Sequence, residues 1–153
     1  MKAGPDDRQL AAWRAFLRAH AQVMDRLDHE LQHEQDLPLT WYEVLLHLAG
    51  APADRLRLNE LAEVVLLSRS GITRLVDRLV GAGLVERQMC PTDRRGAFAA
   101  LTPVGRARLR RAAPVHLRGI QEHFAAHLDD DEVDAIRRGL DKVVDAMRAV
   151  AVR

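Results

Sequence analysis

The feature that most constrains the fold is a change in apolar spacing near Gly83. Over residues 69–82 the apolar side chains recur every three or four residues, as on the buried face of a helix. They are Ile72, Leu75, Val76, Leu79 and Val80. From Val85 onward apolar and polar residues alternate, as in a strand. A shorter amphipathic segment, residues 59–65, precedes the helix and is too short to be stable without packing on it. The sequence therefore predicts two packed helices followed by a strand.

Both ends of the second helix are marked, and its polar face carries a distinctive set of side chains. Ser68 is placed to cap the first turn, and Gly83 suits the left-handed residue that follows many helices. The polar face holds Arg69, Ser70, Thr73, Arg74, Asp77 and Arg78. Hydrogen-bonding groups and cations on an anchored helix suit contact with DNA, with Thr73 and Arg74 facing base edges. We expect Asp77 to orient Arg74 or Arg78.

A β-hairpin is predicted next, with strands over 85–90 and 97–101 and a loop over 92–96. The loop carries one acid and two adjacent guanidinium groups. They are Asp93, Arg94 and Arg95. Two arginines at a hairpin tip suit a narrow DNA minor groove, with the acid holding one of them in position; the alternative is a solvated basic turn. Thr102 and Pro103 then open a further helix.

Three stretches of the chain, residues 37–48, 68–87 and 93–106, resemble the MarR family of winged-helix transcription regulators. The specific part is the wing: an acid, any residue, an arginine, a short strand and then Leu-Thr. The resemblance implies a mainly α fold with a small β-hairpin wing, in which N- and C-terminal helices form a dimerisation region. It also implies release from DNA when a small molecule, an oxidant or a metal engages the protein.

The implied organisation is an N-terminal dimerisation helix over 1–36, a winged helix-turn-helix DNA-binding domain over 37–102, and C-terminal dimerisation helices over 103–153. Three apolar stripes agree with it. They contain Leu10, Trp13, Leu17, Met24, Leu27 and Leu31; Ala113, Leu117, Ile120, Phe124 and Leu128; and Val133, Ile136, Leu140, Val143, Met147 and Val150. Three apolar helix faces are more than one small winged domain needs to cover its own core, so we expect them to be buried against a second copy in a homodimer. The alternative is packing of the three helices within a monomer.

The charge distribution favours an anionic partner for the middle of the chain. Residues 57–111 contain 11 arginines and 5 acids, whereas the two flanking segments are mildly acidic and the whole chain has a net charge of +1. Cations gathered around the predicted helix and wing are the expected footprint of a surface that binds double-stranded DNA.

Length and composition set further bounds. A chain of 153 residues, 48% of them hydrophobic, can bury a core. We expect a cytoplasmic protein with no membrane partner, because the N-terminus lacks an apolar leader segment and no apolar run is long enough to span a bilayer. We find no nucleophile–base pair and no phosphate-binding glycine loop, so we expect neither enzymatic activity nor a cofactor.

Two features raise the alternatives of redox and metal sensing. Cys90, the single cysteine, lies in the predicted wing near arginines that favour a reactive thiolate; the alternative is a structural thiol. His29 and His33 form an HExxH motif, but a catalytic zinc needs a third ligand and a cleft. We therefore assign no metal. The candidates for binding a regulatory metal are His29, His33 and His116, and the alternative is that these histidines are simply solvated.

A group of aromatic residues and histidines lies around the predicted junction of the dimer helices and the DNA-binding part. It comprises Trp13, His20, Trp41, Tyr42 and His47. We expect His20 to be buried on the first helix and to need a partner, and Thr40 to cap the next helix. By resemblance, these residues would form a pocket for a planar, anionic aromatic or phenolic acid. The alternative is ordinary core packing around a satisfied histidine.

The resulting hypothesis is a dimeric repressor that a small effector releases from a pseudo-palindromic operator. Its two recognition helices would enter successive major grooves about 34 Å apart, with the wings in flanking minor grooves. The alternatives are a redox- or metal-responsive regulator of the same fold and an architectural DNA-binding protein without an effector.

Overall fold

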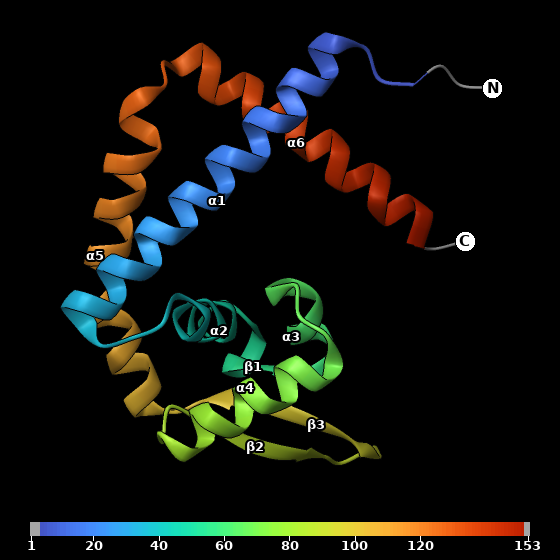
Figure 1. Cartoon of the computed structure of the whole chain (residues 1–153). Helices are drawn as coiled ribbons and strands as arrows, with labels where there is room; N and C mark the ends of the chain where they lie inside the picture. Colours follow the sequence, from blue (N-terminus) through green and yellow to red (C-terminus); the bar gives the residue numbers. More distant parts are fainter. Residues whose placement is uncertain (1–3, 152–153) are drawn as a thin grey trace.

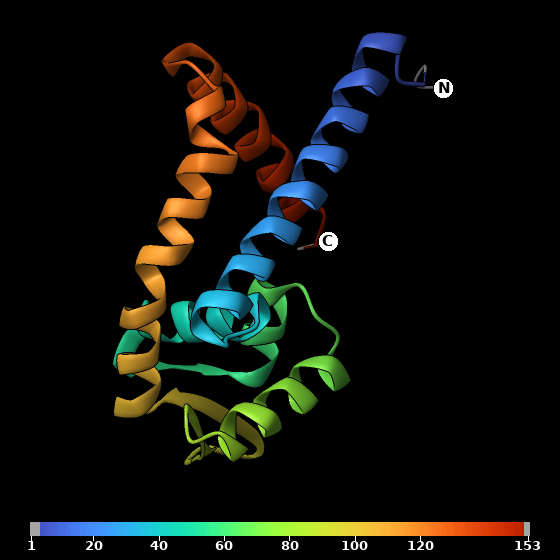
Figure 2. The same ribbon diagram turned by 60° about the vertical axis from the view of Figure 1, so that its left-hand side comes forward.

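The structure, a computed structural model, describes residues 4–151, and the side chains of residues 93–95 and 151 lie outside that description. A winged-helix part lies at one end, and α1 and α5 rise from it side by side (Figures 1 and 2). The helices are α1 (Asp7–Gln35), α2 (Leu39–Ala49), α3 (Leu58–Val65), α4 (Arg69–Gly81), α5 (Pro103–His123) and α6 (Asp130–Ala151). The strands are β1 (Arg55–Arg57), β2 (Val85–Cys90) and β3 (Asp93–Leu101), and short 3₁₀ turns cover Pro52–Asp54 and Ala125–His127. The mainly helical fold with a small wing is thus confirmed.

The wing is a three-stranded antiparallel sheet in the order β1-β3-β2, rather than a two-stranded hairpin. Strand β1 was missed because it has three residues and follows a connector rich in glycine and proline. The predicted loop over 92–96 was also wrong. Strand β3 already begins at Asp93, which pairs with Cys90, whereas Met89 pairs with Ala97. The register shift between these two pairs accommodates residues 94–96 within the strand.

The caps of α4 are as predicted, whereas the cap of α2 is not. Ser68 Oγ accepts the backbone N–H of Gly71 at 3.1 Å, and Gly83 has a φ of 73°, the left-handed conformation. Helix α2 begins at Leu39, one residue before the predicted cap, Thr40. The cap comes from α1 instead, since the N–H of Leu39 donates to Asp28 Oδ1 at 2.8 Å.

The core lies where α4, α2, α3 and the sheet meet the lower halves of α1 and α5. Four members of the predicted α4 stripe are buried: Ile72, Leu75, Val76 and Leu79. The fifth, Val80, is 37% exposed. Leu27 and Leu31 are buried at the C-terminal end of α1 and carry the core onto that helix. The recognition helix therefore rests on a continuous apolar base.

The face of α5 that is buried within the single chain differs from the predicted stripe, of which Ala113 and Ile120 pack against the core. The buried residues of α5 are Gly105, Leu109, Ala112, Val115 and Gly119, while Leu117 is 62% exposed. Leu128 lies beyond the end of the helix. Small residues bring α5 close to α1: a Cβ at Gly119 would lie 2.5 Å from Leu27 Cδ2. The buried face of α5 thus includes glycine and alanine, which the spacing of large apolar residues does not mark.

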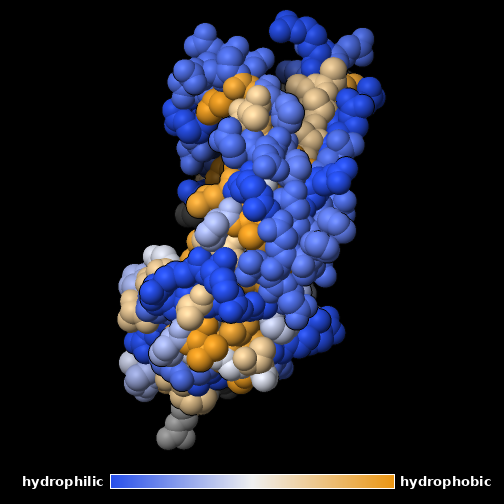
Figure 3. Space-filling view, turned by 90° about the vertical axis from the view of Figure 1, so that its left-hand side faces the viewer, coloured by the Kyte–Doolittle hydropathy of each residue, from blue (hydrophilic) through white to orange (hydrophobic). Residues whose placement is uncertain are grey.

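Apolar side chains on α1 and α6 remain exposed in the single chain. They include Trp13 (56%), Val143 (57%), Met147 (62%) and Val150 (70%). Helix α6 begins at the end of the molecule that is far from the winged-helix part and slants back toward the level of that part (Figures 1 and 2). Orange apolar surface shows in the helical half of the space-filling view (Figure 3). Within residues 4–151, no helix combines the length and apolar character needed to cross a bilayer.

Candidate nucleic-acid interface

The polar face of α4 is exposed along its whole length. Every residue predicted for that face is exposed: Arg69, Ser70, Thr73, Arg74, Asp77 and Arg78. The hydroxyl of Thr73 donates to the carbonyl oxygen of Arg69 at 2.8 Å. Thr73 therefore presents its methyl group and an accepting lone pair outward. This face offers both donors and apolar contact to a DNA groove.

Asp77 does not orient Arg74 or Arg78, contrary to our expectation. Its Oδ1 lies 2.7 Å from the guanidinium of Arg87 on β2. The pair links the recognition helix to the first strand of the wing. Both side chains are substantially exposed, so the pair fixes geometry more than it contributes stability. Alternation along β2 predicted that Arg87 projects from the strand, but the sequence contains no signal for its partner.

A polar hollow separates the start of α3 from α4 and the sheet. Its lining includes three arginines and two further polar side chains, together with Gly96 and Ala97 of β3. The polar residues are Arg57, Asn59, Arg69, Thr73 and Arg87. Three guanidinium groups around one hollow suit a phosphate oxygen. Sequence reasoning missed Arg57 and Asn59, because strand β1 was not predicted.

Strand β1 also extends the cationic surface along the edge of the sheet. The guanidinium carbons of Arg55 and Arg57 lie 4.7 and 5.2 Å from the ring centroid of Phe98 on the neighbouring strand. Arg55 also donates to Gln88 Oε1 at 3.0 Å. The Arg-Leu-Arg alternation of β1 is the sequence signal that would have placed both arginines on one face.

The backbone of the wing places the start of β3 at the end of the hairpin farthest from the helices (Figure 1). Asp93, Arg94 and Arg95 were predicted to contact DNA from there. Their side chains lie outside the described part of the chain. Their roles therefore stay predictions.

Cys90 lies at the end of β2 and is 6% exposed. Its Sγ is 3.3 Å from Thr92 Oγ1. The nearby guanidinium of Arg87 is engaged with Asp77. A buried thiol favours the structural interpretation over the redox-sensing one, which requires an accessible thiolate.

The five residues predicted to form an effector pocket are not brought together. Tyr42 is buried, with its ring 4.4 Å from that of His116. Trp41 packs against the core from α2. His20 and His47 are exposed, so the expected buried histidine was wrong. The reason is that α6, the element of residues 4–151 that faces the N-terminal half of α1, leaves an open hollow there instead of packing closely on its stripe.

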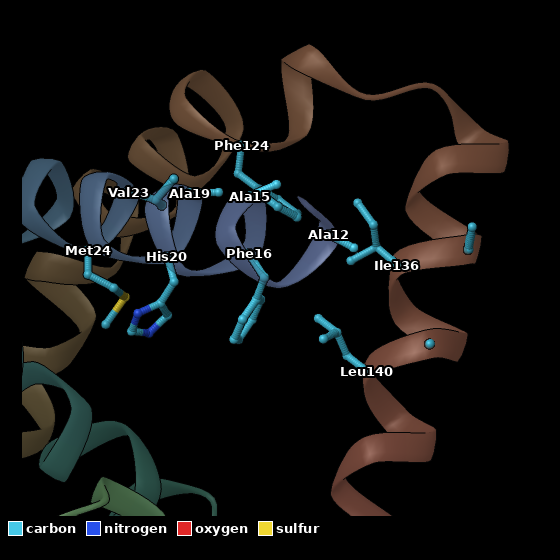
Figure 4. Close-up of a pocket in the computed structure, with 12 residues that line it drawn as sticks. Ala12, Ala15, Phe16, Ala19, His20, Val23, Met24, Phe124, Ile136 and Leu140 are labelled. Atoms are coloured by element: carbon cyan, nitrogen blue, oxygen red, sulfur yellow. The ribbon is translucent and has the colours of Figure 1, made fainter. Parts of the chain in front are cut away.

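His20 instead borders an apolar hollow between α1 and α6, shown in Figure 4. Phe16, Met24, Ile136 and Leu140 also line it. The rings of Trp13 and Phe16 lie 5.9 Å apart, and those of Phe16 and His20 lie 6.2 Å apart. Of the five predicted pocket residues, only His20 lines this hollow, and Trp13 is linked to it through Phe16.

Three titratable groups near the junction of α1, α2 and α5 are shifted by their surroundings. Burial raises the pKa of Tyr42 and lowers the pKa of His116. Burial also raises the pKa of Glu43, while His47 and His20 partly oppose that shift by their charge. His20 and His47 therefore act electrostatically on one carboxyl group, although neither is in the core.

The three candidate metal-binding histidines do not converge either. His29 and His33 are exposed on α1, with ring centroids 6.3 Å apart. His116 lies on α5 against Tyr42, and its Nδ1 is buried without a hydrogen-bond partner among the described residues. Among those residues, the one group of three potential ligands consists of Glu30, Glu122 and His123.

The family of the chain follows from comparison with known proteins. A family model described as the MarR family matches residues 35–96. The multiple antibiotic resistance protein MarR of Escherichia coli is 30% identical over 80% of this chain and 84% of its own length. The chain belongs to the MarR family. The regulator MhqR of Bacillus subtilis is 29% identical over 90% of this chain and 92% of its own length.

Solved structures of MarR-family members share the fold of this chain, and one of them contains DNA. Sco3205 of Streptomyces coelicolor, solved in complex with DNA, is 32% identical with a TM-score of 0.87, covering 95% of this chain and 91% of that one. AbsC from the same organism is 30% identical with a TM-score of 0.86, covering 97% and 99%. This MarR-family protein is a DNA-binding transcription regulator and not an enzyme.

Proposed function

We propose that this MarR-family regulator is a repressor that binds a pseudo-palindromic operator through α4, the hollow beside it and the wing. The observation that carries the proposal is the exposed polar face of α4 directly beside a hollow that three arginines line, Arg57, Arg69 and Arg87. In this arrangement Thr73 and Arg74 contact base edges, while Ser70, Arg78 and the hollow bind the phosphate backbone. Arg94 and Arg95 enter the adjacent minor groove, and Asp93 holds one of them in position.

We further propose a homodimer, because one operator half-site needs one winged-helix part and a pseudo-palindrome needs two. The exposed stripe of α6 supports this proposal, since Val143, Met147 and Val150 are each more than half exposed in the single chain. Burial of such a stripe against the same stripe of a second copy makes a self-complementary interface. In the dimer, residues 1–36 and 103–153 supply the dimerisation region, and residues 37–102 bind DNA.

The effector we propose is an aromatic or phenolic acid bound in the hollow between α1 and α6. The lining shown in Figure 4 is apolar apart from His20. Phe16 offers a stacking surface for an aromatic ring, and His20 offers a hydrogen-bond donor to a carboxylate. A ligand wedged between these helices changes the spacing of the two DNA-binding parts, which weakens their fit to successive major grooves.

The test combines footprinting with a titration of variants. Footprinting on the DNA upstream of the gene locates the operator, and repeating it with aromatic acids, a thiol oxidant or zinc identifies the signal. Fluorescence anisotropy then compares wild-type protein with Arg74→Ala, Arg87→Ala and, as a matched control on α6, Arg138→Ala. We expect Arg74→Ala to weaken binding and to relax its sequence preference, because Arg74 is assigned to base edges. Arg87→Ala is expected to weaken binding and to reduce the slope of log affinity against log salt by about 0.9 for its lost phosphate contact.

Three results would contradict these proposals. Wild-type affinity in both Arg74→Ala and Arg87→Ala would contradict the assignment of the interface. Binding without sequence preference would favour the architectural alternative. For the effector, 4-hydroxybenzoate is expected to release DNA from wild-type protein but not from His20→Ala, with exposed His29→Ala as the control; equal release from all three would remove the hollow from the mechanism.

A further inference from the structure

A group of metal-ligating side chains lies between α1 and α5, away from the DNA-binding face; it includes Glu30, the glutamate of the HExxH motif, but neither of that motif's histidines. Glu30 projects from α1, and Glu122 and His123 come from the last turn of α5. One ligand atom from each of the three lies within 4.8 Å of the others. The two helices pack side by side here (Figures 1 and 2). The group therefore joins two elements that are far apart in the sequence.

Glu30 is the inner member of the group, and only one of its oxygens has a partner. Its Oε1 lies 2.5 Å from His123 Nε2. Its Oε2 is buried and has no hydrogen-bond partner among the described residues. That oxygen lies directly over the backbone of α5, because a Cβ at Gly119 would be 2.7 Å from it. A buried carboxylate oxygen without a partner is costly, and a bound cation removes that cost.

The surrounding charges leave the group able to accept a cation. Arg118, the nearest cation on α5, forms its close ion pair with Glu34, and its Nε is 4.0 Å from Glu122 Oε1. Glu122 is exposed, so its side chain can turn inward without displacing the core. Two carboxylates and a neutral imidazole carry a charge of −2, which a divalent cation neutralises.

We propose that Glu30, Glu122 and His123 bind a divalent transition-metal cation of the zinc type. One imidazole nitrogen and two carboxylate oxygens form a mixed donor set that suits Zn²⁺ better than the all-oxygen set preferred by Mg²⁺. Bonds of about 2.0–2.2 Å place neighbouring ligand atoms about 3.3 Å apart in a tetrahedron. The His123–Glu30 pair must open slightly and Glu122 must approach, and both changes need only side-chain rotation.

With three protein ligands, water completes the coordination shell of the cation. The cation takes the place of the hydrogen bond between His123 and Glu30 and so joins the last turn of α5 to α1. Although Glu30 belongs to the HExxH motif, the site does not use His29 or His33, an exposed pair that offers two ligands on one helix. The proposal does not depend on DNA binding, so its failure would leave the proposed function intact.

The experiment is an isothermal titration of Zn²⁺ into chelator-treated, full-length protein without DNA. We expect saturable binding at one site per chain, with an affinity at least about tenfold lower in Glu122→Gln and in His123→Gln. The control variant, His33→Ala, is expected to bind as wild type does. Glu122→Gln changes an exposed side chain, so it is expected to keep the wild-type circular dichroism spectrum.

Two outcomes would overturn the proposal. One is the absence of saturable Zn²⁺ binding by wild-type protein. The other is that both Glu122→Gln and His123→Gln bind Zn²⁺ with wild-type affinity. If His33→Ala then binds Zn²⁺ more weakly than wild type, the site lies instead at the two histidines of the HExxH motif. A thermal melt supplies a second readout: Zn²⁺ at 100 times its dissociation constant is expected to stabilise wild-type protein, and to stabilise Glu122→Gln clearly less at the same concentration.

Discussion

The proposed homodimer predicts a specific weakness at Val143 on α6. Val143 is 57% exposed in the single chain, and full burial of a valine side chain contributes about 1.5–2 kcal/mol. Burial of the exposed part against a second copy is thus worth about 1 kcal/mol per chain and about 2 kcal/mol per dimer. Val143→Glu removes that contribution, so the dimer dissociation constant is expected to rise by at least about 30-fold. Desolvation of the two new carboxylates increases the effect.

Sedimentation velocity over a range of protein concentrations measures the shift, with far-UV circular dichroism to verify helix content. The matched control is Val104→Glu, because Val104 is 62% exposed. Although it falls within residues 103–153, it lies in the first turn of α5, where the neighbouring Gly105 packs against Leu84 of the winged-helix part. We expect the control to dimerise as wild type does. An unchanged dissociation constant for Val143→Glu, or an equal loss in Val104→Glu, would refute the assignment of the α6 stripe as the interface.

Two further predictions concern stability. Asp28→Ala removes the acceptor that caps the N–H of Leu39, so it is expected to lower the free energy of unfolding in urea by about 1 kcal/mol. The control Thr40→Ala is expected to change that free energy by less than about 0.5 kcal/mol. Equal losses in the two variants would show that Thr40 also caps α2. His116→Phe keeps the ring against Tyr42 and removes an unpaired buried nitrogen, so it is expected to stabilise the chain by about 1 kcal/mol at pH 7. Since burial lowers the pKa of His116, the unfolded state binds its proton more readily. Wild-type stability therefore falls as the pH drops below about 6.5, and that fall is expected to be smaller in the variant.

The recognition helix could be predicted closely because each signal that defines it is local. Ser68 and Gly83 mark its ends, and four large apolar residues one or two turns apart define its buried face. Its exposed face follows directly, since whatever is not in the apolar stripe must point away from the core. The charge distribution adds independent support, because 11 of the chain's arginines fall within residues 57–111.

The contacts that the sequence could not supply are those made across distance in the chain. Asp28 caps a helix 11 residues away, and Asp77 binds an arginine on a strand rather than one on its own helix. Strand β1 exists because β3 offers it a free edge, and three residues carry too little pattern to predict that pairing. The missed arginines at the interface, Arg55 and Arg57, are a direct consequence.

The buried face of α5 also could not be predicted from the sequence, because its closest contact is made by a glycine. The spacing of apolar residues predicts that Leu117 and Ile120 are buried and does not mark Gly119. Gly119 nevertheless lies where α5 and α1 pack closely together. A glycine in a helix lowers its intrinsic stability, so it is retained where a side chain does not fit. At Gly119 the missing Cβ makes room for Leu27 and for Glu30 Oε2 together. Close packing of these two helices and the candidate cation site therefore depend on the same small residue.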